Sequence, residues 1–244
     1  MKIYGLIGYP LSHSFSKGFF AQKFEKENIT GCLYENFPLP GIADFPTLLQ
    51  QQPELNGLNV TIPYKQVVIP HLDDLSKAAA QIGAVNCIRF KDGKKTGYNT
   101  DVIGFRNSLQ PLLQPHHNRA LVLGTGGAAK AVIYALQEMG IAYTIISRQA
   151  TNEALSYSSL DQAAMEAHTL IINTTPLGMY PHIDTLPEIP YQYITSRHLL
   201  YDLVYNPPET LFLQRGAAQG AVIKNGHEML ILQAEASWEL WNQD

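Results

Sequence analysis

Short apolar runs alternate with amphipathic stretches along the first hundred residues of this 244-residue chain. The apolar runs predict strands at 2–8, 32–38, 57–62, 84–90 and 95–99. The stretches between them predict helices at 17–28, 41–52, 67–75 and 76–82. Strands that alternate with helices in this way indicate an α/β domain with a mixed sheet.

A more regular alternation of strands and helices follows in the second half of the chain. We expect a helix from Val102, directly after Asp101, to about Leu113, and the polar stretch 115–118 after it suggests a domain boundary. The pattern from Arg119 to about Ile223 is typical of βαβ units. A last helix at 226–242 is apolar on one face, and nothing local assigns it to either half.

The second half opens with a glycine-rich motif in a complete structural context. An apolar strand at 120–123 is followed by Gly124-Thr-Gly126-Gly127-Ala128-Ala129, then by a helical pattern and a strand at 142–146. Glycine permits the tight turn and lets backbone approach a pyrophosphate, which the N–H groups of the helix N-terminus then bind. The motif therefore predicts a dinucleotide site, with a plain glycine turn in another α/β protein as the alternative.

The residues at the end of the strand expected at 142–146 bear on the choice between NAD and NADP. An acidic residue there would bind the ribose 2′-hydroxyl of NAD. This chain has Ser147-Arg148, and the next acid is Glu153. Because arginine binds phosphate well, the sequence favours NADP over NAD. No second basic residue follows within five positions of Arg148, so use of NAD as well stays open.

Composition narrows the class of function. Apolar residues make up 45% and charged residues 16% of the chain, which is ordinary for a folded soluble protein. A net charge of −4 provides no basic field for nucleic acid or an anionic membrane. We see no signal peptide and no apolar run near the roughly 20 residues of a membrane helix. Two distant cysteines, Cys32 and Cys87, and the lack of an HxxxH or HExxH pair predict no metal site. The low cysteine content also predicts a reducing, cytoplasmic location.

Polar side chains gather in three segments of the first half. Hydroxyls crowd the stretch Gly8–Ser16, while Asn59 and Thr61 share one side of a strand that precedes Lys65. An amide, a hydroxyl and a carboxylate follow each other at Asn99–Asp101. Because open α/β sheets bind ligands at strand ends, these segments are candidates for a substrate site.

Six motifs in this order resemble the shikimate dehydrogenase family over nearly the whole chain, from Gly8 to Gln233. Each motif is weak alone, and together they are specific. They are GxPxxHSxS at 8–16, NVTxPxK at 59–65, AVN at 84–86, NTD at 99–101, the glycine turn, and MLxxQA at 229–234.

The resemblance implies an N-terminal α/β substrate domain at 1–102, completed by the C-terminal helix at 226–244, and a Rossmann-type NADP-binding domain at 103–225. It implies reversible reduction of 3-dehydroshikimate to shikimate by NADPH, a step of chorismate and aromatic amino acid biosynthesis. The partner would be this small molecule, with no nucleic acid or membrane, and the protein would be a monomer or homodimer.

The resemblance also assigns residues to roles. Lys65 and Asp101 would be the catalytic pair for proton transfer. The substrate would be bound by Ser14, Ser16, Asn59, Thr61, Asn86, Asp101, Tyr205 and Gln233. The cofactor would be held by Gly124, Gly126, Gly127, Ala128, Ser147 and Arg148, with Thr174 and Met229 on its nicotinamide side.

The chemistry of these residues suits a ring with three hydroxyls and a carboxylate, since a site built from hydrogen-bonding groups rejects analogues that lack them. Singly, each has a simpler explanation. From position alone, Lys65 is a solvated lysine after a strand, and Asp101 caps a helix. Ser14 could equally be a loop hydroxyl, Asn86 could bond the backbone of a turn, and Tyr205 could be a packing residue. The six ordered motifs outweigh these alternatives.

Departures from the family leave alternatives open. Lys17 stands where the family usually has proline, and Gln149 follows Arg148 where threonine is common. Glu228 stands just before Met229, where the family usually has a small residue, and the sequence offers no explanation for this acid. A quinate/shikimate dehydrogenase that uses NAD is a close alternative, which Ser14 mildly disfavours. A non-catalytic dinucleotide-binding module is another, and retention of Lys65 and Asp101 argues against it. A folate-reducing relative of the fold is disfavoured by the hydroxyl-rich loop.

Overall fold

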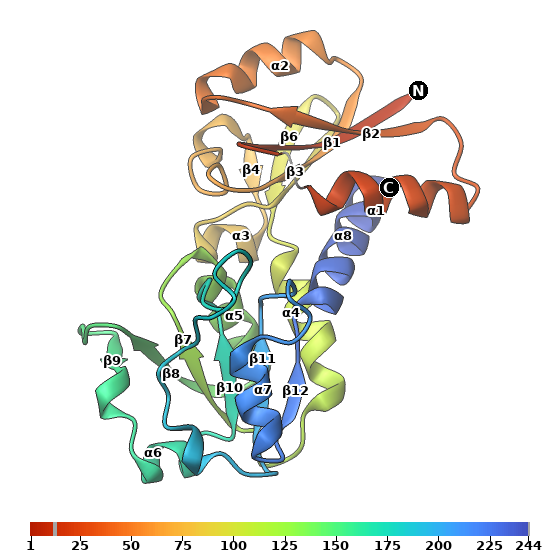
Figure 1. Ribbon diagram of the computed structural model, residues 1–244. Helices are drawn as coiled ribbons and strands as arrows, with labels where there is room; N and C mark the ends of the chain where they lie inside the picture. Colours follow the sequence, from red (N-terminus) through yellow and green to blue (C-terminus); the bar gives the residue numbers. More distant parts are fainter. Residues whose placement is uncertain (12–13, 244) are drawn as a thin grey trace. The chain divides into compact units, whose positions relative to one another are not determined.

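The computed structural model describes residues 1–11 and 14–243, and the chain divides into two compact units. Unit 1 comprises Met1–Thr100 and Gln233–Asp244, and unit 2 comprises Asp101–Leu232. Each unit contains a six-stranded sheet with helices packed on it (Figure 1). The expected fold class, a mixed-sheet α/β domain together with a Rossmann-type domain, is confirmed.

The sheet of unit 1 is mixed, in the order β2-β1-β3-β5-β6-β4. Its centre is parallel, whereas β3–β5 and β5–β6 are antiparallel. The strands are β1 (Lys2–Gly8), β2 (Cys32–Pro38), β3 (Leu55–Val60), β4 (Asp74–Leu75), β5 (Cys87–Lys91) and β6 (Lys94–Tyr98).

Alternate residues of β1 face two different cores, as the two-residue period of a strand requires. Ile7 packs in one core with side chains of α2 (Phe45–Gln51) and α3 (Lys77–Ile82). Tyr4 and Leu6 pack in the other with α1 (Phe15–Lys26) and the end of α8 (His227–Asn242). This second core is aromatic, and the Tyr4 ring stacks on Trp241 at 4.9 Å between centroids.

The sheet of unit 2 is wholly parallel, in the order β12-β11-β10-β7-β8-β9. Strand order reverses between β7 and β10, which is where doubly wound sheets bind dinucleotides. The strands are β7 (Arg119–Leu123), β8 (Ala142–Ser147), β9 (Ala154–Ser156), β10 (Leu170–Asn173), β11 (Leu199–Asp202) and β12 (Val222–Lys224).

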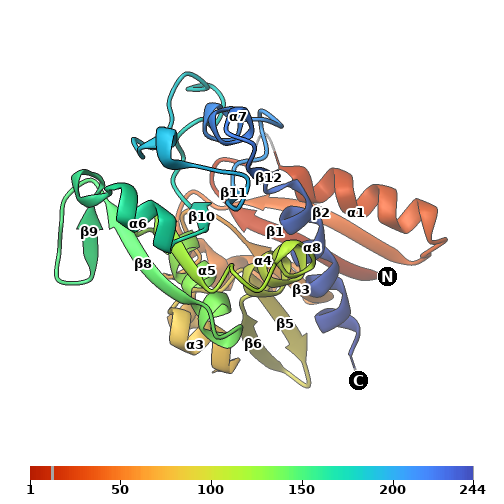
Figure 2. The same cartoon turned by 90° about the horizontal axis from the view of Figure 1, so that it is seen from below.

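Helices cover both faces of this sheet (Figure 2). On one face, α4 (Asp101–Leu109) packs beside α5 (Gly127–Glu138), and Phe105 of α4 meets Tyr201 of β11 edge to face at 5.1 Å. On the other, α6 (Gln162–Ala167) and α7 (Leu211–Ala218) share a core with alternate strand residues such as Leu121 and Leu200. No helix of the described chain has both the length and the apolar character needed to span a bilayer.

Two expectations from the local pattern are wrong. The stretch 67–75 is not a helix, because Pro70 limits it to a 3-10 turn at Ile69–His71 and Asp74–Leu75 instead pairs with β6. The polar stretch 115–118 is not a boundary, since it lies inside unit 2, which already begins at Asp101. The last helix, α8, begins in unit 2 and belongs to unit 1 from Gln233 onward.

Candidate active site

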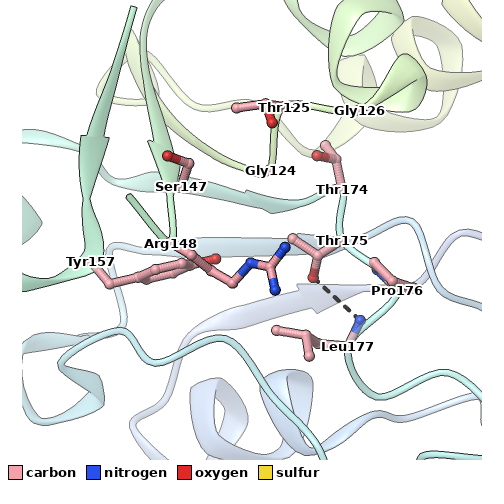
Figure 3. Close-up of a pocket in the computed structure, with 10 residues that line it drawn as sticks. All are labelled: Gly124, Thr125, Gly126, Ser147, Arg148, Tyr157, Thr174, Thr175, Pro176 and Leu177. Carbon is pink, nitrogen blue, oxygen red and sulfur yellow. Dashed lines mark hydrogen bonds between the residues drawn. The ribbon is translucent and has the colours of Figure 1, made fainter. Parts of the chain in front are cut away.

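A cavity of about 340 Å³ lies in unit 2 where strands β7, β8 and β10 end (Figure 3). The segments that line it are those that follow the three strands, together with a 3-10 turn at Tyr157–Ser159. Five of the expected cofactor residues are among its lining: Gly124, Gly126, Ser147, Arg148 and Thr174. The cavity therefore sits beside the reversal of strand order, where the topology of the sheet predicts a ligand.

The fold constrains two glycines of the turn, Gly124 and Gly126, differently. Gly124 has φ of +113°, and a Cβ there would lie 2.7 Å from Oγ1 of Thr174, so both conformation and space demand glycine. Gly126 has an ordinary φ of −75°, and a Cβ would meet no protein atom within 4 Å. The fold itself thus leaves Gly126 unconstrained, and the open space above it fits a phosphate group at the start of α5.

Arg148 extends from the end of β8 into the cavity, between Tyr157 and Thr175 (Figure 3). Burial and the Glu188 carboxylate raise the pKa of the Tyr157 phenol, and the Arg148 guanidinium partly opposes this. Tyr157 therefore stays a neutral hydrogen-bond donor beside a fixed positive charge. Ser147 donates a hydrogen bond to the carbonyl of Gln149, which shapes the loop that carries Arg148.

The loop after β10 is held from behind by a buried carboxylate. Asn173 accepts hydrogen bonds from the backbone N–H (3.0 Å) and hydroxyl (2.6 Å) of Thr175, and it donates to Asp202 at 2.9 Å. Asp202 also accepts from the Thr210 hydroxyl at 2.6 Å and from the Val204 N–H at 3.0 Å. Asn173 and Asp202 are fully buried, so this chain of hydrogen bonds orients one wall of the cavity.

Three expected cofactor residues are not among the lining of this cavity. Gly127 and Ala128 form the first turn of α5, directly after the cavity-lining Gly126. Met229 is half-buried in the first turn of α8. Their roles stay predictions.

A second polar cluster lies inside unit 1 and includes three of the expected substrate residues: Asn59, Asn86 and Gln233. Oδ1 of Asn86 accepts from the N–H of Thr100 at 2.6 Å, and its Nδ2 lies 3.5 Å from Oε1 of Gln233. The hydroxyl oxygen of Ser14 is buried and has no hydrogen-bond partner in the part of the chain that the structure describes. Such an oxygen fits a polar ligand, because burial without a partner is otherwise costly.

The remaining expected residues are distributed between the units. Ser16 lies in the first turn of α1, and Thr61 and Lys65 follow β3. The carbonyl of Lys65 accepts from the N–H of Val85 at 2.7 Å, which ties its segment to the one that bears Asn86. Asp101 begins α4 and is joined directly to Thr100, whereas Tyr205 is 40% exposed in the loop after β11. Both belong to unit 2.

Sequence reasoning missed several residues in and behind the cavity of unit 2. The cavity is also lined by Thr125, Thr175, Pro176 and Leu177, which have no sequence signal of their own beyond lying near expected cofactor residues. Tyr157 stands in a serine-rich stretch without a motif. Asp202 did carry a signal, as a lone carboxylate that ends a buried apolar strand.

Comparison with known proteins gives a consistent result over almost the whole chain. Residues 6–88 match the family described as the shikimate dehydrogenase substrate binding domain. A protein of Clostridium beijerinckii named shikimate dehydrogenase (NADP(+)) is 38% identical over 255 residues, which cover 100% of this chain and 93% of the relative.

Solved structures agree in fold. Shikimate 5-dehydrogenase from Thermus thermophilus, in complex with NADP(H) and shikimate, is similar with a TM-score of 0.87 and 30% identity, over 99% of this chain and 94% of the other. A 5-ketofructose reductase of Gluconobacter sp. strain CHM43 is also similar, with a TM-score of 0.88 and 28% identity over 99% and 92% of the two chains.

Proposed function

Because this chain belongs to the shikimate dehydrogenase family, we propose that it catalyses the reversible reduction of 3-dehydroshikimate to shikimate with NADPH, a step of chorismate and aromatic amino acid biosynthesis. The observation that carries the proposal is the 38% identity to a shikimate dehydrogenase over the full length of this chain. Unit 1 would bind the substrate and unit 2 the cofactor.

The cavity of unit 2 is our proposed cofactor site. The open space above Gly126 receives the pyrophosphate at the N-terminus of α5, and Arg148 binds the 2′-phosphate. Gly124, Ser147 and Thr174 shape the walls of this site. We also assign Gly127, Ala128 and Met229 to the cofactor, on the strength of their positions in the family motifs.

The substrate's hydroxyls and carboxylate are assigned to unit 1 together with Tyr205. The hydroxyl oxygen of Ser14 has no hydrogen-bond partner among residues 1–11 and 14–243, which supports a role for Ser14 and Ser16 in binding the carboxylate. The amides of Asn86 and Gln233 and the hydroxyl of Thr61 would bind ring hydroxyls.

Lys65 and Asp101 are our proposed proton-transfer pair. The bound nicotinamide supplies the hydride. Lys65 gives a proton to the oxygen of the carbonyl that is reduced, and Asp101 orients the ammonium group and the substrate hydroxyl beside it. Support comes from the place of both residues in the family motifs and from the hydrogen bond that fixes the backbone of Lys65 next to the Asn86 segment.

The test is turnover of the purified protein, followed by the absorbance of the reduced cofactor. We expect oxidation of NADPH with 3-dehydroshikimate, slower oxidation of NADH, and little with 5-ketofructose, the substrate named for one structural neighbour. Absence of turnover with 3-dehydroshikimate and either cofactor would refute the function, and faster turnover with NADH would refute the cofactor assignment. Lys65→Ala should lose roughly 10²–10⁴-fold in kcat with little change in KM.

Arg148→Ala tests the cofactor site. Loss of a charged hydrogen bond to phosphate should raise KM for NADPH by roughly 10- to 100-fold and leave KM for NADH nearly unchanged. Arg106→Ala is the matched control, since Arg106 is a partly exposed arginine of the same unit that pairs with Glu138 at 3.6 Å. Equal changes for both cofactors would contradict a contact between Arg148 and the 2′-phosphate.

Two further expectations complete the proposal. Both cysteines, Cys32 and Cys87, are free thiols, which supports a reducing compartment such as the cytoplasm. We expect a monomer or a homodimer, which light scattering coupled to size-exclusion chromatography distinguishes.

A further inference from the structure

Asn59, one of the expected substrate residues, has both N–H groups of its side chain engaged by the protein. Its Nδ2 donates to the backbone carbonyl of Asn86 at 3.2 Å and to the hydroxyl of Ser237 at 2.9 Å. Its Oδ1 accepts from the phenol of Tyr34 at 2.9 Å. The side chain is buried, so water does not compete for these bonds. Asn59 therefore has no N–H group left to donate to a substrate, and its orientation is set by its partners.

The network continues from Ser237 to the residues that we assign to the substrate. The Ser237 hydroxyl donates to the backbone carbonyl of Gln233 at 2.9 Å and lies 3.2 Å from the hydroxyl of Thr100. The hydroxyl of Thr100 lies 3.2 Å from Oδ1 of Asn86, which also accepts from the Thr100 N–H. The side-chain carbonyl oxygen of Asn86 is thereby anchored, which fixes the direction of its NH₂ group, 3.5 Å from Oε1 of Gln233.

Tyr34 stands at the other end of this network. Its ring is buried and stacks on Phe20 at 4.4 Å between centroids, so the direction of the hydroxyl is fixed by packing. Ser16 is a second hydrogen-bonding partner of the phenol. Burial raises the pKa of Tyr34, so the phenol keeps its proton and remains a donor to Asn59. One hydroxyl thus connects the serine loop with the amides of the neighbouring strands.

We propose that Tyr34 is a positioning residue for substrate recognition: it fixes the amide of Asn59, which in turn holds the segment of Asn86 and the helix that carries Gln233. The inference rests on the proposed function of this site. Asn59 then acts through the residues that it holds, and it has no N–H group to donate to the substrate. Tyr34 and Ser237 were not selected from the sequence, since their partners are 25 to 178 residues away.

Tyr34→Phe is the appropriate variant, because it keeps the stacked ring and removes only the hydroxyl. Oδ1 of Asn59 then loses its donor in a buried place, and the amide is free to turn. We expect KM for 3-dehydroshikimate to rise about tenfold, with KM for NADPH and kcat changed less than about twofold. Ser237→Ala, which removes the other side-chain partner of Asn59, should shift the same KM in the same direction.

Tyr4→Phe is the matched control. Tyr4 is fully buried in the same aromatic core, and its hydroxyl bonds the side chain of Asn242 at 3.3 Å, outside the network. Tyr4→Phe should lower the melting temperature by no more than Tyr34→Phe, because the Tyr4 bond is longer and only partly buried, and it should leave both KM values unchanged. A split between substrate KM and melting temperature therefore separates positioning of the site from general loosening of the core.

Each outcome decides the proposal. An unchanged substrate KM in Tyr34→Phe, or an equal rise in Tyr4→Phe, would overturn it while wild-type turnover leaves the proposed function intact. If the wild type itself fails to reduce 3-dehydroshikimate, both the function and this inference fall together.

Discussion

Replacing Asp202 with asparagine should make unit 2 progressively more stable, relative to the wild type, as pH rises. Burial raises the pKa of the Asp202 carboxyl from its ordinary 3.8 to about 6, despite hydrogen bonds from Thr210, Val204 and Asn173. A carboxyl whose folded-state pKa is raised contributes its full stability below the unfolded pKa of 3.8. That contribution is lost as pH rises toward 6, because the unfolded chain ionises first.

The magnitude follows from the shift. Two pKa units at about 1.4 kcal/mol each correspond to about 3 kcal/mol between pH 3 and pH 7. Asparagine has nearly the same shape and does not titrate, so it avoids this cost at neutral pH. Its Oδ1 can still accept from Asn173 and Val204, and its NH₂ group can donate to the Thr210 hydroxyl. The difference in unfolding free energy between variant and wild type should therefore shift by about 3 kcal/mol in favour of the variant over this range.

Hydrogen exchange followed by mass spectrometry on peptides from β10 and β11 measures the free energy of local unfolding around Asp202. Comparison of the two proteins at each pH cancels the intrinsic pH dependence of exchange. Both tryptophans, Trp238 and Trp241, belong to unit 1, so their fluorescence during urea unfolding serves as the internal control. A free-energy difference that stays constant with pH, or that shifts in favour of the wild type at higher pH, would refute the assignment of a raised pKa to Asp202.

Three further predictions concern stability. Burial lowers the pKa of His117, so the folded protein should lose stability as pH drops below 6.5 and the unfolded chain takes up the proton first. In His117→Gln the melting temperature should fall less over the same drop in pH. Gly57→Ala should cost roughly 1–3 kcal/mol in urea unfolding and shift tryptophan fluorescence, because its Cβ would lie 2.3 Å from the Trp241 ring. Lys23→Met should cost about 1 kcal/mol, less at high salt, through loss of the 2.6 Å ion pair with Glu235.

Each of these has an outcome that contradicts it. The histidine argument is wrong if the variant and the wild type lose the same stability on acidification. An unshifted fluorescence spectrum in Gly57→Ala would mean that the indole of Trp241 does not move. A loss in Lys23→Met that is independent of salt would assign the effect to packing of the lysine's methylenes and not to charge.

Local pattern was a good guide where one short segment contains its own explanation. The run from Arg119 to Ser147 holds strand, turn, helix and strand in sequence, and the structure has them as β7, α5 and β8. Prediction from the local pattern failed where the backbone of a segment pairs with a distant strand. Residues Asp74–Leu75 pair with β6 about twenty positions later, and no helical periodicity reveals such a partner.

The sequence by itself determined the fold class, the family and the glycine turn, because these depend on residue type at fixed short spacing. Only the tertiary structure decided which side chains surround those positions. It shows that Gly126 faces open space while Gly124 is packed against Thr174, and that Asn59 is bonded to Tyr34 and Ser237. Hydrogen bonds across 25 or 178 residues leave no periodicity in the sequence, since folding brings the partners together only when the whole sheet and the last helix have formed.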